Sequence, residues 1–165
     1  MADEPRVGAR SVLAPDAMPA DGRQSDRALA VQRGVRRHLR QAGLASICEV
    51  TLKSGRRADI MALSPAGEIW IVEIKSSVAD LRSDAKWPDY TDFCDRFYFA
   101  TLADVPHDIF PADAGLFVAD GYGAHCLREA GASALAPARR KAVTLLFARH
   151  AASTLHALAD PHLES

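Results

Sequence analysis

The hydrophobic pattern first becomes regular after residue 24, where it predicts a helix. Ser25 and Asp26 can cap its first turn, and Gly43 is typical of the position just after a helix end. Between them, apolar residues recur at helical spacing: Ala28, Val31, Val35 and Leu39. Five arginines and a single acid share this segment, so the predicted helix carries a basic cluster.

Short strands are predicted after this helix. Segments at about 45–52, 57–63 and 68–76 have strand patterns, and the Pro-Ala-Gly sequence at 65–67 favours a hairpin between the second and the third. Residues 78–95 are polar and acidic and are expected to hold a short helix. Further strands are predicted at 96–101, 115–119 and 124–127.

A long final helix is predicted to begin at Pro137, because proline is favoured at the first helical position. Four apolar residues fit its buried face: Val143, Leu146, Phe147 and Leu155. The order of elements predicts an α/β sandwich, a mixed central sheet flanked by helices, as a single domain over residues 25–160. Residues 1–24 show no periodicity and are expected to form a flexible N-terminal tail.

Composition and charge exclude several classes of protein. The 165 residues are 48% hydrophobic and 25% charged, which is an ordinary globular balance. A net charge of −1 excludes a uniformly basic nucleic-acid binder but allows one basic face. Neither a membrane helix nor a signal peptide is visible, and three dispersed cysteines match no zinc spacing: Cys48, Cys94 and Cys126. We therefore expect a cytoplasmic protein without membrane contact.

The strand candidate at 68–76 places charged residues among apolar ones. Its period of two puts Glu73 and Lys75 on the same face. Burying isolated charges there would cost several kcal/mol each, so a partner charge or a metal ion has to compensate. Asp59 interrupts the apolar run of the preceding strand, and antiparallel pairing through the 65–67 turn could bring it beside Glu73.

Two neighbouring carboxylates repel each other unless a cation lies between them. A hard divalent cation suits their oxygens, and Mg²⁺ fits best. Lys75 would then face whatever the metal polarises, an arrangement that suits phosphodiester hydrolysis. The alternative is a buried salt-bridge network of Asp59, Glu73 and Lys75 that only shapes the fold.

The spacing of Asp59, Glu73 and Lys75 resembles the D…(D/E)xK signature of the PD-(D/E)xK nuclease superfamily. The order of elements is similar to the αβββαβ core of these restriction-endonuclease-like proteins. Longer segments closely resemble the MmcB family of bacterial DNA repair proteins: RRADIMALSP at 56–65, EIWIVEIKSS at 68–77, DAKWPDYTDFCDR at 84–96, GLFVAD at 115–120 and LAPARRKAV at 135–143.

This resemblance implies a small cytoplasmic DNA repair protein, an endonuclease that depends on Mg²⁺ or Mn²⁺. Its partners would be DNA and other DNA repair proteins. Asp59 and Glu73 match the metal-binding acids, with the backbone carbonyl of Ile74 as a further ligand, and Lys75 matches the catalytic lysine. Many members carry Gln-x-x-x-Tyr on the next helix, where residues 86–90 place lysine and tyrosine at that spacing.

One departure from the superfamily pattern concerns the first helix. Many of these nucleases carry a further metal-side glutamate there, whereas this helix has none. Gln32 is its nearest polar counterpart, and Glu49 on the first strand could supply the charge or face solvent. This keeps open an alternative function, a catalytically weak or inactive nuclease-fold protein that binds DNA or acts as an adaptor in DNA repair.

Several further residues are candidates for DNA contact. The basic clusters on the first and last helices could follow a DNA backbone or could be solvated helix faces; their members include Arg36, Arg37, Arg139 and Arg140. Three residues of the polar segment could contact DNA or pack partly in the core: Lys86, Trp87 and Tyr90. The aspartates of this segment are expected to form a solvated face: Asp80, Asp84, Asp89, Asp92 and Asp95.

Overall fold

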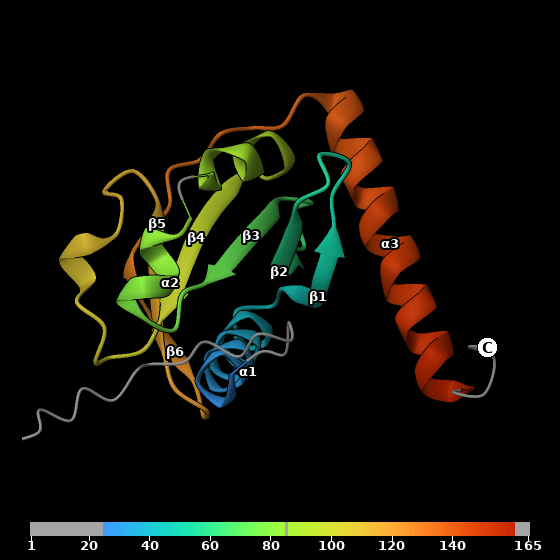
Figure 1. The fold of residues 1–165 in the computed structure, drawn as a ribbon. Coiled ribbons are helices and arrows are strands. Elements are labelled where there is room, and N and C mark those ends of the chain that lie inside the picture. The colour runs from blue at the N-terminus through green and yellow to red at the C-terminus, as the bar shows by residue number, and fades with distance from the viewer. Residues whose placement is uncertain (1–24, 85, 161–165) are drawn as a thin grey trace, which may run out of the picture.

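A computed structural model describes residues 25–84 and 86–160 of the chain, so the expected N-terminal tail lies outside the described residues. Helices cover both faces of one six-stranded sheet (Figure 1). The helices are α1 (Asp26–Gln41), α2 (Val78–Arg82) and α3 (Pro137–Ala159), with the 3-10 helices η1 (Trp87–Phe93) and η2 (His107–Ile109). The strands are β1 (Ala45–Thr51), β2 (Arg57–Leu63), β3 (Ile69–Ile74), β4 (Arg96–Thr101), β5 (Gly115–Ala119) and β6 (Ala124–Arg128).

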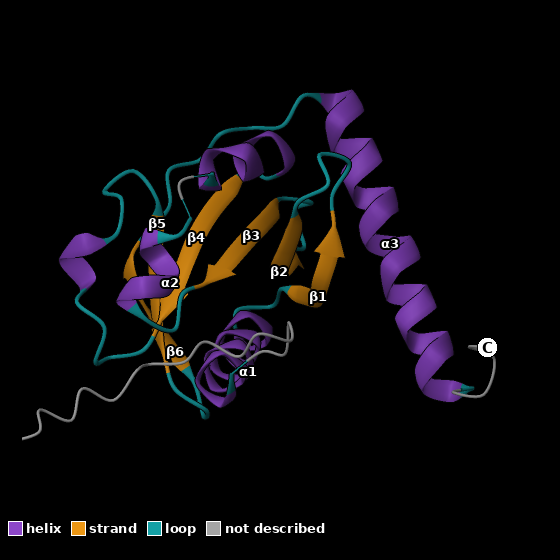
Figure 2. Ribbon diagram, viewed as in Figure 1, coloured by secondary structure: helices purple, strands orange, loops and turns teal. Residues whose placement is uncertain are grey.

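The strands lie in sequence order across a mixed sheet (Figure 2). β1, β2 and β3 pair antiparallel, as do β5 and β6, whereas β3, β4 and β5 run parallel. Short turns join the antiparallel strands β1 to β3, and Gly67 in the predicted hairpin has a φ of +84°. Parallel strands need a longer crossover, which α2 and η1 supply between β3 and β4.

The central strands are more deeply buried than the edge strands. Every residue of β5 is buried, and β3 and β4 each have one partly exposed residue. In the edge strands, most residues of β1 are half-buried, and β6 alternates between half-buried and exposed residues. Because helices cover both faces of the parallel strands, their sequences are almost continuously apolar.

Helix α1 covers one face of the sheet and buries Val31, Val35 and Leu39 against it. Ser25 caps it as predicted, since its Oγ accepts a hydrogen bond from the backbone N–H of Ala28 at 3.2 Å. Gly34 allows the close approach to the β5–β6 turn, because a Cβ there would lie 2.1 Å from the carbonyl oxygen of Asp120.

The other face of the sheet is covered by α2, η1 and α3. α3 begins at Pro137 as predicted and buries Val143 and Phe147. The prediction that Leu155 lies on the buried face is wrong, because that residue is 69% exposed. Figure 1 shows the reason: the C-terminal half of α3 extends beyond the sheet and has no core to pack against.

Candidate active site

Asp59 and Glu73 lie side by side on β2 and β3. Ile60 pairs with Val72 across the two strands, and this register places Asp59 opposite Glu73, as predicted. The backbone N–H of Asp59 donates to Oε1 of Glu73 at 3.2 Å, and the N–H of Ile74 donates to Oδ2 of Asp59 at 2.8 Å. The backbone therefore fixes one oxygen of each carboxylate.

Lys75 follows immediately after the last residue of β3. Its backbone stays attached to β4, because its N–H donates to the carbonyl of Ala100 at 2.9 Å and its own carbonyl accepts from Thr101 Oγ1 at 2.7 Å. The Nζ of Lys75 lies 4.0 Å from Oε2 of Glu73 and 2.8 Å from Oδ2 of Asp84. The strand end thus holds the predicted acid and amine together, with an additional aspartate.

These side chains differ in how well their charges are compensated. Burial raises the pKa of Glu73 to about 8, and the negative charge of Asp59 adds to the effect. Burial likewise raises the pKa of Asp59 to about 6, against the hydrogen bond from Ile74. Burial alone would lower the pKa of Lys75, but its hydrogen bond and ion pair with Asp84 raise it. The protein would therefore compensate the negative charge of the two acids only in part if both were ionised.

Asp84 is a site residue that the sequence analysis missed. A solvated position was expected for it, and this is wrong, because its carboxylate is largely buried and pairs with Lys75. Burial would raise the pKa of Asp84, but the hydrogen bond and ion pair with Lys75 lower it. Asp80 is also engaged, since its Oδ2 accepts from the backbone N–H of Ser76 at 3.0 Å. The sequence did contain a sign of this pair: a lysine at the end of a buried strand needs an acidic partner, and the segment that follows the strand is rich in aspartate.

Glu49 lies close to the pair, in an unusual backbone conformation. It stands opposite Asp59 in the β1–β2 register, and its φ of +56° is in the left-handed region that favours glycine. Its carboxylate accepts from Nε of Arg57 at 2.7 Å, and its charge contributes to the raised pKa of Asp59. Gln32, the other candidate for the extra ligand, lines a groove along α1.

The aromatic candidates for DNA contact pack in the core. The ring of Trp87 stacks on Phe97 at 5.2 Å, and Tyr90 is 5% exposed, with its hydroxyl donating to the carbonyl of Arg57 at 3.1 Å. Lys86 is exposed at the start of η1, where its backbone N–H donates to Asp84. Both rings thus pack partly or fully in the core, which was the alternative to DNA contact.

The basic candidates have different surroundings on the two helices. On α1, Nε of Arg36 lies 3.4 Å from Oγ of Ser46, and Arg37 donates to the carbonyls of the β5–β6 turn. On α3, the Arg139 guanidinium lies 5.0 Å from the centre of the Phe93 ring. Arg140 forms a bidentate ion pair with buried Asp95, so its guanidinium anchors α3 to the body of the protein.

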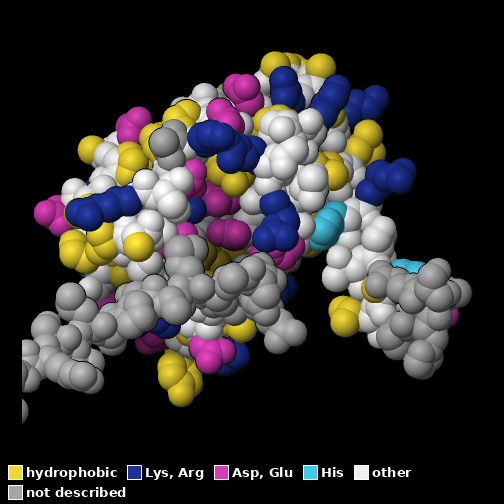
Figure 3. Space-filling view, in the orientation of Figure 1, with side chains coloured by type: hydrophobic (Ala, Val, Ile, Leu, Met, Phe, Trp, Pro, Cys, Tyr) yellow, Lys and Arg dark blue, Asp and Glu magenta, His cyan; other side chains and the backbone are white. Residues whose placement is uncertain are grey.

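The donor set suits a hard cation. No three His, Cys, Asp or Glu side chains among the described residues form a metal-binding group. Mg²⁺, however, is commonly held by only one or two carboxylates, with water and substrate phosphate as its other ligands. Figure 3 shows acidic side chains in a hollow over the end of β3, with Lys and Arg side chains around it. Two neighbouring carboxylates with raised pKa values fit such a cation.

The fold and this cluster together define a class of protein. It is a mixed α/β protein in which a six-stranded mixed sheet, flanked by helices, brings two carboxylates and a lysine to adjacent strand ends. A family model described as DNA repair protein MmcB-like matches residues 15–162. The chain therefore belongs to the MmcB-like family of DNA repair proteins, and the family's name indicates a role in DNA repair.

The comparison with solved structures agrees with the fold. A protein of unknown function from Silicibacter pomeroyi superposes with a TM-score of 0.82 and shares 45% sequence identity. The match covers 86% of this chain and 97% of that chain. No curated protein matches the sequence. None of the described helices is long and apolar enough to cross a membrane.

Proposed function

We propose that this protein is a metal-dependent endonuclease of the PD-(D/E)xK type that hydrolyses phosphodiester bonds of DNA during repair. The observation that carries the proposal is the register of β2 and β3, which sets Asp59 beside Glu73 with Lys75 on the same side of the sheet. The proposal keeps DNA as substrate, other repair proteins as further partners and the cytoplasm as location, as expected from the sequence.

Asp59, Glu73 and the carbonyl of Ile74 would hold Mg²⁺ or Mn²⁺. When bound, such a cation polarises a water molecule and the scissile phosphate and offsets the charge of the two acids. The backbone hydrogen bonds to both carboxylates hold them in place before substrate arrives. Lys75 donates hydrogen bonds to phosphate oxygens, where its charge stabilises the additional negative charge of the transition state. For this, the ammonium of Lys75 must leave its ion pair with Asp84 and contact the phosphate instead.

The proposal is tested by incubating the full chain with plasmid, branched, flapped and single-stranded DNA in Mg²⁺ or Mn²⁺. We expect Lys75→Ala to lower the cleavage rate by about 10²–10³-fold, the effect of removing one donor that stabilises transition-state charge. Lys53→Ala is the matched control, since Lys53 is exposed in the turn after β1. Equal cleavage by the wild type and Lys75→Ala would assign the activity to a contaminant.

The second candidate function is a nuclease-fold protein that binds DNA or a repair partner without cutting it. Two observations favour it: Lys75 is already paired with Asp84 at 2.8 Å, and Glu49, the nearest candidate for a third acid, is paired with Arg57. Calorimetric titration with Mn²⁺ separates the two candidates. Heat no larger than that of an Asp59→Ala variant would favour the protein that does not cut.

Glu49 offers a sharper test of the metal site. A residue other than glycine costs about 1–3 kcal/mol in a sparsely populated backbone region, and such strain is often found at functional sites. Glu49→Gly removes both the strain and the carboxylate. We expect it to raise the stability of the metal-free protein and to weaken Mn²⁺ binding. Unchanged Mn²⁺ affinity would mean that Glu49 is no ligand.

A further inference from the structure

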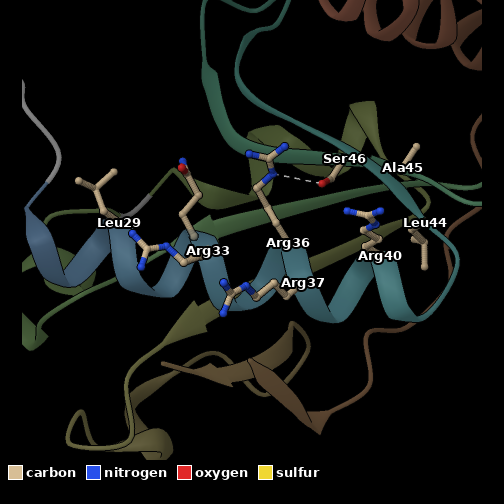
Figure 4. Close-up of a pocket in the computed structure, with 9 residues that line it drawn as sticks. Leu29, Arg33, Arg36, Arg37, Arg40, Leu44, Ala45 and Ser46 are labelled. Carbon is tan, nitrogen blue, oxygen red and sulfur yellow. Dashed lines mark hydrogen bonds between the residues drawn. The ribbon is translucent and has the colours of Figure 1, made fainter. Parts of the chain in front are cut away.

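A groove runs along α1 beside the start of β1 and encloses about 630 Å³ (Figure 4). Its lining combines arginines with a few polar and apolar residues: Leu29, Gln32, Arg33, Arg36, Arg37, Arg40, Leu44, Ala45 and Ser46. The four arginines are spaced i, i+3, i+4 and i+7, so they lie on one face of the helix. Helical geometry therefore gathers four guanidinium groups along a single groove.

Acids offset this charge only in part: the pKa of the exposed Asp120 is lowered by its backbone hydrogen bonds and, in smaller measure, by the charge of Arg37. In the part of the chain that the structure describes, no acidic side chain forms an ion pair with any of the four arginines. The contacts of Arg36 and Arg37 are neutral, to the hydroxyl of Ser46 and to the carbonyls of Gly121 and Tyr122. The groove is thus positively charged although the whole chain has a net charge of −1.

The apolar packing of α1 does not depend on these arginines. α1 is anchored by its opposite face, where Val31, Val35 and Leu39 are fully buried. Like charges three or four residues apart destabilise a helix by about 0.2–0.5 kcal/mol per pair. A repulsive cluster that packing does not require indicates a polyanionic ligand.

We propose that this groove binds the phosphate backbone of DNA, independently of metal. The inference rests on the proposed function in taking DNA as the substrate. From Arg33 to Arg40 the helix rises about 10 Å, at about 1.5 Å per residue. Over that length of duplex axis, each DNA strand carries about three phosphates, one per about 3.4 Å. The planar guanidinium fork of arginine matches phosphate oxygens in pairs.

The first turn of the same helix reaches the candidate active site. The guanidinium of Arg27 donates to the backbone carbonyl of Ser76 at 3.3 Å, one residue after Lys75. Glu73 alternates with Val72 and Ile74, which pack against α1, so the acid pair faces the other side of the sheet, and the first turn of α1 is where the groove side approaches the site.

The test measures binding of the full chain to labelled single-stranded DNA, and to a duplex of the same sequence, by fluorescence anisotropy in EDTA. Arg33→Gln/Arg40→Gln should weaken binding at least about tenfold at about 50 mM salt. It should also make the salt dependence of log K shallower by about 1.4 for the single strand or about 1.8 for the duplex. The slope reports on phosphate contacts, which a purely structural role would leave unchanged.

Two further variants control for charge and folding. Lys53→Gln/Arg149→Gln removes the same charge from exposed positions outside the groove and should change affinity less than about twofold. Arg33→Lys/Arg40→Lys keeps the charge and should retain the salt slope while losing the paired hydrogen bonds. Because the glutamines relieve repulsion, the first double variant should melt at the wild-type temperature or above it.

The outcomes separate this inference from the proposed function. Loss of binding in Arg33→Gln/Arg40→Gln, with normal binding by Lys53→Gln/Arg149→Gln and no cleavage by the wild type, would support the groove and overturn the endonuclease. Cleavage by the wild type, with unchanged binding by the double variant, would overturn the groove and leave the endonuclease standing. Absence of metal-free DNA binding by the wild type at low salt would also overturn the groove.

Discussion

Two buried carboxylates of the same sheet have opposite electrostatic environments. Asp95 is 3% exposed just before β4, and Glu73 is 4% exposed in β3. Asp95 accepts backbone hydrogen bonds from Ile69 at 2.7 Å and from Leu135 at 2.9 Å, in addition to two from Arg140. Glu73 accepts one backbone hydrogen bond at 3.2 Å, and the nearest cation lies 4.0 Å away.

The consequence is a difference in the sign of the pKa shift. Burial would raise the pKa of Asp95, but the hydrogen bonds from Arg140 and the backbone lower it. Burial raises the pKa of Glu73 to about 8 because no equivalent set of donors compensates it. The protein is therefore able to satisfy a buried acid, and does so where the acid holds α3 in place. At Glu73 the compensation is left incomplete, which suits a group that binds a cation from outside.

The strongest test of this comparison is Asp95→Ala. It leaves two buried backbone N–H groups without an acceptor and removes the partner of Arg140, so we expect a loss of about 3–5 kcal/mol in the free energy of unfolding. Urea denaturation followed by circular dichroism measures it. A loss below about 1 kcal/mol would show that the site contributes no more than an exposed ion pair.

The next test uses the pH dependence of the metal-free protein. Because the pKa of Glu73 rises from 4.5 to about 8 on folding, its protonated form stabilises the fold below the unfolded value, and this contribution is lost as pH rises through about 8. Glu73→Gln cannot ionise. The variant should therefore lack a loss of about 3–4 kcal/mol in the free energy of unfolding that the wild type undergoes between about pH 5 and about pH 8.

Asp95 provides the internal control for that experiment. Its pKa is lowered on folding, so its contribution is present above the unfolded value of 3.8 and is lost only as pH falls below it. Between about pH 5 and about pH 8 it should stay constant. Unfolding curves across this range measure both behaviours, and parallel pH profiles of the wild type and Glu73→Gln would contradict the assignment.

A smaller effect is expected from Arg140→Lys. Arg140 forms a bidentate pair with Asp95 and also donates to the carbonyl of Gly67 at 2.6 Å. Lysine keeps the positive charge but cannot make these contacts at the same time. We expect a loss of about 1–2 kcal/mol, since the charge remains and only directed hydrogen bonds disappear. Thermal unfolding measures this loss, with Arg139→Lys as the matched variant. Equal losses in the two variants would contradict a specific contribution from the bidentate pair.

The smallest effect should come from an exposed ion pair. Arg56 and Asp89 lie 3.0 Å apart, with side chains 31% and 54% exposed. Solvent screens such a pair, so a double-mutant cycle should give a coupling below about 1 kcal/mol that shrinks further in salt. A coupling as large as that of Asp95 with Arg140 would mean that burial does not set the difference between these acids.

Much of the fold and the centre of the candidate site could be predicted from local pattern. α1 ends where Gly43 adopts a φ of +83°, β4 and β5 have the predicted bounds, and β3 ends two residues before the predicted strand does. The partners of Asp84 and Asp95 could not be predicted, because both lie in a segment whose polarity resembles that of a solvated surface. Only the path of the chain over the end of β3 brings Asp84 to Lys75.

The sequence by itself determined that Asp59 and Glu73 would face each other, because a short turn and the two-residue period of strands leave few registers that keep apolar side chains inside. It also determined the basic face of α1, since helical spacing is local. Tertiary structure alone decided that the groove arginines of α1 form no ion pair with a described acid, while Arg27 of the same helix pairs with Asp104 and Arg140 of α3 pairs with Asp95. Charge compensation depends on which distant side chains the fold brings within a few ångströms, and no local pattern contains that distance.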